Sequence, residues 1–411
     1  KFNTPRDIQW PDLRALYSLY VAHPNYFSLV EPAAYLTQAT SSERITETIT
    51  AGYIQGELKS FKNRLAVVGG VRFERTQDDG VGLLRDRNAI YQHDAAGNLI
   101  RNAAGSPILI ATDPLAQAKL AYTPRGLAVS QSYDGYYPSA NLSFNATTNL
   151  QFRLSYAQTL GRPEFSNIVP NVDVNEDTET VTARNPALKP WTAKNFEVSA
   201  EYYFRTSGVV SVGLFRKDVT NAFIAARSIL DLALLAQYGL DGAYEGWTLV
   251  GRSNSSEVTR ILGLELNYEQ QLKFLPAWAQ GVSIFANGTF LDTEGSERIG
   301  LSLQDKTVNW GVSYSRKRFG VGLKWNYIGE DRRSVSGIGV GGVSVAKPIL
   351  TLDVNSEFRI TPRLSVFFNA RNLTNALTRT YRYSPLTPIY SRTYTFSDRG
   401  VKMSAGIRGT F

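Results

Sequence analysis

Hydrophobic and polar residues alternate along most of this chain with a period of two. One example is the segment LQFRLSYA at residues 150–157, where large apolar side chains occupy every second position. The last residues, VKMSAGIRGTF at 401–411, follow the same pattern. Successive side chains of a β-strand point to opposite faces. Each such segment therefore predicts an extended strand with one apolar and one polar face.

About thirteen segments of roughly ten residues have this pattern and predict antiparallel strands. They lie at residues 45–60, 64–77, 133–146, 149–160, 194–205, 209–223, 256–274, 280–294, 303–315, 318–331, 348–361, 364–375 and 392–411. Short connections such as TTN and SRKR alternate with long ones, of which the longest are 78–132, 161–193 and 224–255. Short turns at one rim and long loops at the other are typical of a transmembrane barrel.

Two further features favour a membrane barrel over a soluble β-sandwich. Strands of about ten residues, tilted by roughly 45°, are about as tall as the apolar band of an outer membrane. The polar faces also carry charges of both signs in mid-strand, such as Arg153, Glu197 and Lys324. A water-filled lumen can hold such charges, whereas a dry sandwich core cannot. The sequence therefore predicts an all-β fold, a transmembrane antiparallel β-barrel.

The composition narrows the possible functions. Lys and Arg number 44 against 36 Asp and Glu, but the two signs are interspersed, so nucleic acid is not expected as a partner. There is no cysteine, which excludes thiol catalysis and cysteine-ligated metals. The two histidines, His23 and His93, belong to no visible catalytic constellation. We therefore expect no enzyme activity, no cofactor and no metal site.

Several segments, in their order and spacing, resemble the C-terminal barrel of TonB-dependent outer-membrane receptors. They are GGVRFERT (69–76), YPSANLSFNATTNLQFRLSYAQTLGRPEFSNIVP (137–170), ARNPALKPWTAKNFEVSAEYYF (183–204), ILGLELNYEQQL (261–272), NARNLTN (369–375) and the terminal Phe411. The resemblance implies that residues 44–411 are the last 13 or so strands of a barrel of about 22 strands around an N-terminal plug. The plug and the first strands have no counterpart in these residues. Residues 1–43 are then expected to be an extracellular loop with a short helix in PDLRALYSLYVA.

The resemblance also implies a location and partners. The protein would lie in the outer membrane of a Gram-negative bacterium, surrounded by lipid. It would take up a scarce ligand, namely a siderophore, a corrinoid or an oligosaccharide, with energy from the TonB–ExbB–ExbD complex acting through the N-terminal region. The family resemblance further implies that the barrel assembly machinery reads Phe411 as an assembly signal. A passive porin-like channel remains the alternative, because it would have the same strands.

Candidate ligand-binding residues lie in the long connections. Aromatic rings suit stacking on sugars or other flat ligands, and arginine favours an anionic ligand. The candidates are Tyr244, Trp247, Tyr381, Arg382, Tyr383 and Tyr390.

Overall fold

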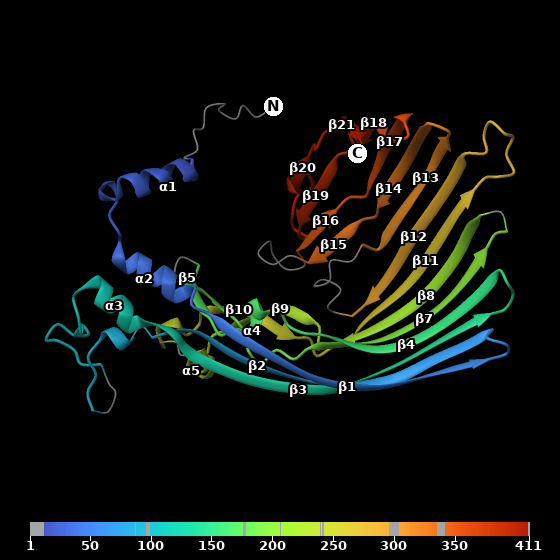
Figure 1. Cartoon of the computed structure of the whole chain (residues 1–411). Helices are drawn as coiled ribbons and strands as arrows, with labels where there is room; N and C mark the ends of the chain where they lie inside the picture. Colours follow the sequence, from blue (N-terminus) through green and yellow to red (C-terminus); the bar gives the residue numbers. More distant parts are fainter. Residues whose placement is uncertain are drawn as a thin grey trace.

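The computed structural model describes residues 12–86, 88–95, 99–175, 178–205, 207–238, 240, 242–295, 304–334 and 342–409. Its main element is an antiparallel sheet of 13 strands. The sheet curves strongly, so that it forms a trough (Figure 1). In order across the sheet, the strands are β1 (Arg44–Ser60), β2 (Leu65–Arg85), β3 (Tyr122–Asn145), β4 (Leu150–Gly161), β7 (Trp191–Tyr203), β8 (Gly208–Thr220), β11 (Thr259–Gln271), β12 (Val282–Glu294), β13 (Lys306–Arg316), β14 (Phe319–Ile328), β17 (Ile349–Thr361), β18 (Leu364–Arg371) and β21 (Lys402–Gly409).

Two smaller sheets are formed by the long connections. One has the order β5 (Val172–Asn175), β6 (Thr180–Ala183), β10 (Thr248–Asn254) and β9 (Phe223–Ile229). The other has the order β15 (Asp331–Ser334), β16 (Val343–Ala346), β19 (Thr378–Tyr383) and β20 (Thr393–Ser397). The sequence pattern did not predict either sheet, because their strands of four to seven residues are too short to show a clear period.

The helices lie outside the main sheet. They are α1 (Leu13–Ala22), α2 (Glu31–Thr40), α3 (Pro114–Ala121), α4 (Phe165–Ile168) and α5 (Leu232–Tyr238), with short 3-10 turns at Pro24–Tyr26, Asn88–Ile90, Gly242–Tyr244 and Ile389–Ser391. Helix α1 begins after Asp12, whose carboxylate accepts hydrogen bonds from the backbone nitrogens of Arg14 and Ala15. No helix in the described part of the chain is both long and apolar enough to span a membrane.

Each of the thirteen predicted strands corresponds to one strand of the main sheet, although two predictions need correction. The segment 392–411 is not one strand, because β20 pairs with β19 and only β21 joins β18 in the main sheet. The helical spacing of SILDLALLAQYGL also predicts a helix over residues 228–240, and the observed α5 is shorter because residues 228 and 229 belong to β9. Phe411 lies outside the described residues, and the assignment of residues 1–43 to an extracellular loop remains a prediction.

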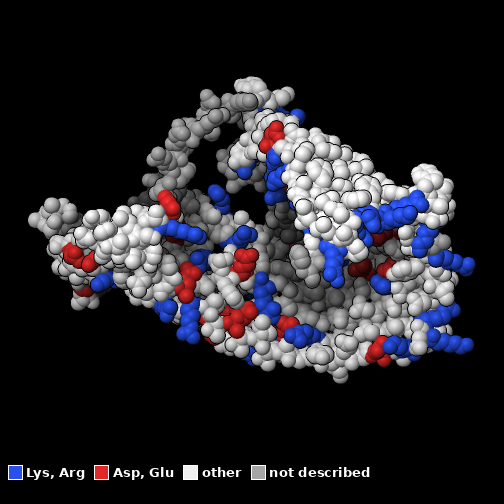
Figure 2. Space-filling model, turned by 45° about the horizontal axis from the view of Figure 1, so that its top comes forward, with Lys and Arg blue, Asp and Glu red and all other residues white. Residues whose placement is uncertain are grey.

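The register of the sheet sorts the side chains into an apolar and a polar face. Leu154, Val198, Leu214, Leu264 and Phe290 are aligned across five neighbouring strands on the apolar face. The next row lies on the opposite face, where Ser155 and Glu197 are aligned with Phe215, Gly263 and Leu291, so that face mixes polar and apolar side chains. Figure 2 looks into the hollow of the curved sheet, where charged side chains of both signs are visible.

The paired residues of β2 and β3 show where the apolar band ends on the side of the long connections. Phe73 and Tyr136 face each other across β2 and β3, with ring centroids 5.2 Å apart. Two residues further along the same face, Arg75 is opposite Asp134. Because a charged pair on the lipid-facing side of a barrel is costly at membrane depth, the membrane-spanning part of these strands ends near the aromatic pair. The rest of β2 and β3 extends beyond the band.

We predict that a charge on the apolar face is far more damaging than the same charge on the polar face. Leu264 lies in the middle of the apolar band, opposite Leu214 and Phe290. Leu264→Arg should lower the free energy of unfolding in lipid vesicles by about 2–4 kcal/mol. Asn267→Arg, on the polar face of the same strand, is the matched control and should cost much less. Equal losses in denaturant titrations of the two variants would contradict the assignment of the faces.

Candidate functional site

The polar face of the main sheet carries a depression lined by charged and small polar side chains. Arg153 lies at its edge, where Nη1 donates a hydrogen bond to Glu201 at 2.8 Å and Nη2 donates one to Gln151 at 2.8 Å. Tyr203 donates a further hydrogen bond to Glu201 at 2.6 Å. The other polar residues of the depression are Ser155, Glu197, Ser199, Ser211, Glu265, Asn267, Asn287 and Thr289. This face is a hydrophilic wall, suited to contact with water and polar ligands.

Arg162 fastens the connection after β4 to the polar face of β2. Its guanidinium forms an ion pair with Glu74 and donates a hydrogen bond from Nε to Oγ1 of Thr76 at 3.2 Å. Glu47 of β1 lies 4.0 Å from the same Nε. One arginine thus links the connection after β4 to β1 and β2, two neighbouring strands that lie much earlier in the sequence.

The same connection makes two further contacts with the extended parts of β2 and β3. Gly82 packs so closely against Pro170 that an added Cβ would collide with the carbonyl oxygen of that proline. Gln131 of β3 donates a hydrogen bond to the carbonyl oxygen of Leu188 at 3.0 Å. The segment from Arg162 to Leu188 is therefore held against the wall of the trough above the apolar band.

Asp78 is buried beside this contact region, with 4% of its surface exposed. It lies opposite Glu47 in the register of β1 and β2, and both residues belong to the polar face. Burial raises the pKa of the Asp78 carboxyl, and the negative charge of Glu47 raises it further, while Gln131 and Arg162 act in the opposite direction. The carboxyl lies beyond the apolar band, at the level of the long connections.

Two of the candidate ligand-binding residues, Tyr244 and Trp247, lie in the connection between β9 and β10, beside the first small sheet. Their rings form an edge-to-face pair with centroids 4.9 Å apart. Tyr244 is 4% exposed and belongs to a hydrophobic cluster with Val181, Leu230 and Leu235. In this conformation Tyr244 packs the small sheet from inside, and a role of the pair in ligand contact remains a prediction.

The other four candidates lie in or beside the second small sheet. Tyr381, Arg382 and Tyr383 are consecutive residues of β19, and Tyr390 belongs to the 3-10 turn between β19 and β20. Cations and rings alternate here: the guanidinium of Arg382 is 3.7 Å from the ring centroid of Tyr394, and that of Arg392 is 4.7 Å from the ring of Tyr383. Tyr390 is 88% exposed, so its ring is free to contact a ligand.

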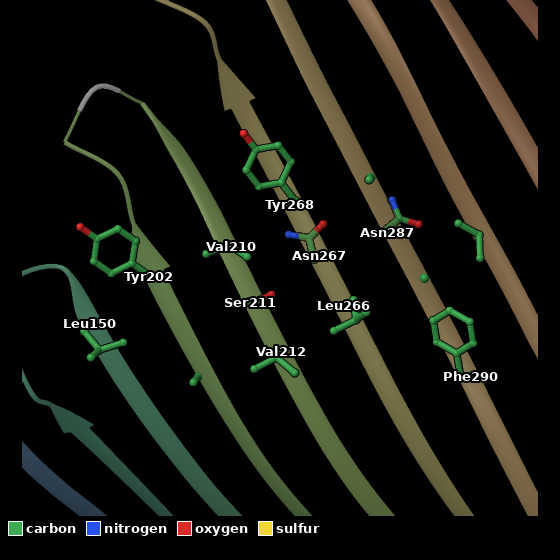
Figure 3. A pocket seen from close by; sticks show the side chains of 14 residues that line it. Leu150, Tyr202, Val210, Ser211, Val212, Leu266, Asn267, Tyr268, Asn287 and Phe290 are labelled. Atoms are coloured by element: carbon green, nitrogen blue, oxygen red, sulfur yellow. The ribbon is translucent and has the colours of Figure 1, made fainter.

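A second depression lies on the apolar face (Figure 3). Val210, Val212, Leu266 and Phe290 point into it from β8, β11 and β12, and Tyr202 lies at its border. Its lining is almost entirely apolar, so it offers no groups for recognising a polar ligand. Because this face belongs to the apolar band, we assign the depression to lipid contact.

Sequence reasoning missed the cluster around Arg162. The GRP motif at 161–163 predicts a rigid boundary between loop and strand, but it does not show that the arginine reaches β1 and β2. The sequence did contain one sign of this cluster. Glu74, Thr76 and Asp78 alternate on one face of β2, at the end of the predicted strand 64–77, and β2 in fact continues beyond that end. In the described part of the chain, no group of three or more His, Asp or Glu side chains is arranged to hold a metal ion.

Replacing Arg162 should release the connection from the wall of the trough. Hydrogen bonds to charged groups contribute about 1.5–3 kcal/mol, so Arg162→Ala should lower the free energy of local opening by about that amount. Amide hydrogen exchange of residues 163–190 measures this opening. Arg184→Ala is the matched control, because its ion pair with Glu43 at 2.7 Å lies at the other end of the connection. The prediction is wrong if Arg162→Ala leaves the exchange of residues 163–170 unchanged, or if Arg184→Ala speeds it by the same amount.

Asp78 should make stability depend on pH. Its folded-state pKa is raised above the ordinary value of 3.8, so the folded state binds the proton more tightly. Stability is then greatest below the ordinary pKa and falls as the pH rises through the folded-state value. Asp78→Asn should be more stable than the wild type at neutral pH, and the difference should vanish near about pH 3. Asp79→Asn, one residue away and exposed, is the control variant in the same denaturation curves.

Comparisons with known proteins agree with this architecture. A family model described as "TonB dependent receptor-like, beta-barrel" matches residues 2–373. No curated protein matches the sequence. Similar solved structures include the ferric enterobactin receptor of Pseudomonas aeruginosa, with 14% identity, a TM-score of 0.55 and coverage of 90% of this chain and 55% of that one.

Two other solved structures are similar to the same extent. The ferric-catecholate import receptor of E. coli K12 has 15% identity and a TM-score of 0.56, with coverage of 90% of this chain and 45% of that one. The copper transporter OprC has 10% identity and a TM-score of 0.55, with coverage of 90% and 49%. At these identities the likeness concerns the fold, and the chain spans about half the length of these proteins. The chain belongs to the TonB-dependent receptor family of the Gram-negative outer membrane, and its main sheet is part of the transmembrane β-barrel of that family.

Proposed function

We propose that the whole protein takes up a scarce ligand across the outer membrane with energy supplied by the TonB–ExbB–ExbD complex. The observation that carries the proposal is the family match over residues 2–373. In this proposal the ligand binds to the long connections and the upper polar face. The N-terminal region of the whole protein, with its plug, would contact TonB.

The second small sheet is the part of the chain best suited to ligand contact. Arg379, Arg382 and Arg392 lie on or beside it, and each guanidinium packs over an aromatic ring. Such a surface offers positive charge together with flat apolar area, which suits an anionic aromatic ligand. Tyr381, Arg382, Tyr383 and Tyr390 are our candidates here, and Tyr244 and Trp247 are the candidates beside the other small sheet.

Among siderophores, corrinoids and oligosaccharides, the charge of this surface favours a siderophore. Complexes of ferric iron with catecholates are anionic and aromatic, so they combine the two properties that the Arg and Tyr side chains complement. Two of the similar solved structures are receptors for ferric enterobactin and for ferric catecholates, and a third is a copper transporter. These names supply candidate ligands for a first screen.

A passive channel is the second candidate function. The observation that favours it is the hydrophilic wall around Arg153 and Glu201, which would also suit a water-filled pore. Uptake by cells that produce the full-length protein separates the two functions. Energised uptake should saturate and stop when a protonophore removes the proton gradient, whereas passive flow should continue and rise in proportion to ligand concentration.

We predict that Tyr390 contributes directly to ligand affinity. Because its ring is 88% exposed, Tyr390→Ala should leave the fold intact. Loss of one stacking contact should raise the Kd of the purified full-length receptor by about 2- to 12-fold. Leu386→Ala is the matched control, because Leu386 is 94% exposed in the same connection but has no ring. An unchanged Kd in titrations of Tyr390→Ala with a ligand that binds the wild type would remove this residue from the site.

A further inference from the structure

The six short connections of the main sheet carry basic residues but no acidic ones, apart from the connection between β3 and β4, which has no charged residue. They join β1 to β2, β3 to β4, β7 to β8, β11 to β12, β13 to β14 and β17 to β18. We call them, with two flanking residues on each side, the short-turn rim: residues 59–66, 144–151, 202–209, 270–283, 315–320 and 360–365. This rim contains nine basic residues and no Asp or Glu, although the chain has 36 acidic residues. The nine are Lys59, Lys62, Arg64, Arg205, Lys273, Arg316, Lys317, Arg318 and Arg363.

Several of the basic side chains of the short-turn rim are exposed, whereas the guanidinium of Arg64 donates hydrogen bonds to the carbonyl oxygens of Asn145 and Ala146. Lys62, Arg316, Lys317 and Arg318 are exposed and form no ion pair with any residue that the structure describes. Lys62 and Lys317 lie at the turn tips, where φ is 56° and 52°. Lysine and arginine side chains project from the edge where the strands turn (Figure 2). Within the chain, Lys59 pairs with Glu57 at 2.8 Å, just outside the rim as defined.

Aromatic residues place this rim at the border of the apolar band. Phe61, Phe274 and Trp278 lie in the same short connections and are 68%, 73% and 71% exposed. Arg316 is opposite Phe319 in the register, and Phe319 is opposite Phe358, so the arginine belongs to the apolar face. Aromatic rings favour the level of the lipid headgroups. Arginine at this depth extends its charged end towards the same level.

The opposite border of the apolar band has a different charge pattern. Arg216 and Asp218 form an ion pair at 2.8 Å on the same face. Arg260 pairs with Asp218 at 3.2 Å and with Glu294 at 3.1 Å. The cations there are neutralised by carboxylates of the same chain. Among the residues that the structure describes, Lys62, Arg316, Lys317 and Arg318 of the short-turn rim have no carboxylate partner, whereas Lys59 pairs with Glu57.

We propose that the short-turn rim binds the anionic headgroups of phospholipids in the leaflet that faces the periplasm. In a membrane barrel the short turns lie on the periplasmic side. The cations lie next to lipid-facing aromatic rings, so phosphate groups of neighbouring lipids are within their reach, and arginine matches a phosphate with two parallel hydrogen bonds. This proposal rests on membership of the barrel family and is independent of the proposed uptake function.

The proposal can be tested with the full-length receptor in phosphatidylcholine vesicles. Spin-labelled phosphatidylglycerol, added in trace amounts, reports the fraction of lipid held at the protein surface, and spin-labelled phosphatidylcholine is the reference. The wild type should prefer phosphatidylglycerol, and high salt should weaken the preference. Arg316→Gln/Lys317→Gln/Arg318→Gln should lower the relative association constant by about fivefold or more, because one cation near an anionic surface contributes about a fivefold factor.

A control variant removes the same charge from the long connections. Lys119→Gln/Lys189→Gln/Arg227→Gln changes three exposed cations of the connections beyond the apolar band, and it should keep the wild-type preference. Equal losses in both variants, or no preference in the wild type, would overturn the proposal. Should the triple rim variant fail to insert, Lys62→Gln/Lys273→Gln provides the same test with two cations on other turns. Competition by inorganic phosphate at millimolar concentration would also overturn it, because the ligand would then be free phosphate.

Discussion

The fold depends on the continuous hydrogen-bonded ladder that joins 13 strands into one sheet. In a lipid environment every backbone N–H and C=O must find a partner within the protein. Strand pairing meets this requirement, and it also fixes the register across the sheet. The row from Leu154 to Phe290 is a consequence, because one slip of a single residue would move Arg153 and Glu265 into the hydrocarbon.

Beyond the apolar band, water can also pair with backbone N–H and C=O groups, so the chain there is not restricted to the strands of the main sheet. β2 and β3 remain paired beyond the apolar band, on the side of the long connections. The connection after β4 packs against them through Arg162 and Pro170. The long connections form their own small sheets with their own hydrophobic contacts, such as the cluster around Val181 and Leu230. Water at this level tolerates charge and irregular backbone, so these parts of the molecule are free to carry recognition.

The distribution of charged side chains also differs between the two borders of the apolar band. Arg216 and Arg260 are paired with carboxylates at the border next to the long connections, while Lys62, Arg316, Lys317 and Arg318 at the short turns have no carboxylate partner among the described residues. A barrel wall therefore has two chemically distinct rims around one apolar band. The proposed roles use this difference: ligand contact lies with the long connections, and lipid headgroups are met at the short turns.

The sequence by itself determined the strands, their faces and the alternation of short and long connections. A period of two is a local property, and residues such as Leu264 and Glu265 reveal their faces without any knowledge of their neighbours. The start of β21, the two small sheets and the position of Arg162 were decided by the tertiary structure. The break before Lys402 depends on β20 finding β19 as its partner, and strands of about five residues show too few periods to be recognised alone. Arg162 contacts Glu74 and Thr76 across 88 and 86 residues of sequence, and only the packing of the connection against β2 brings these side chains together.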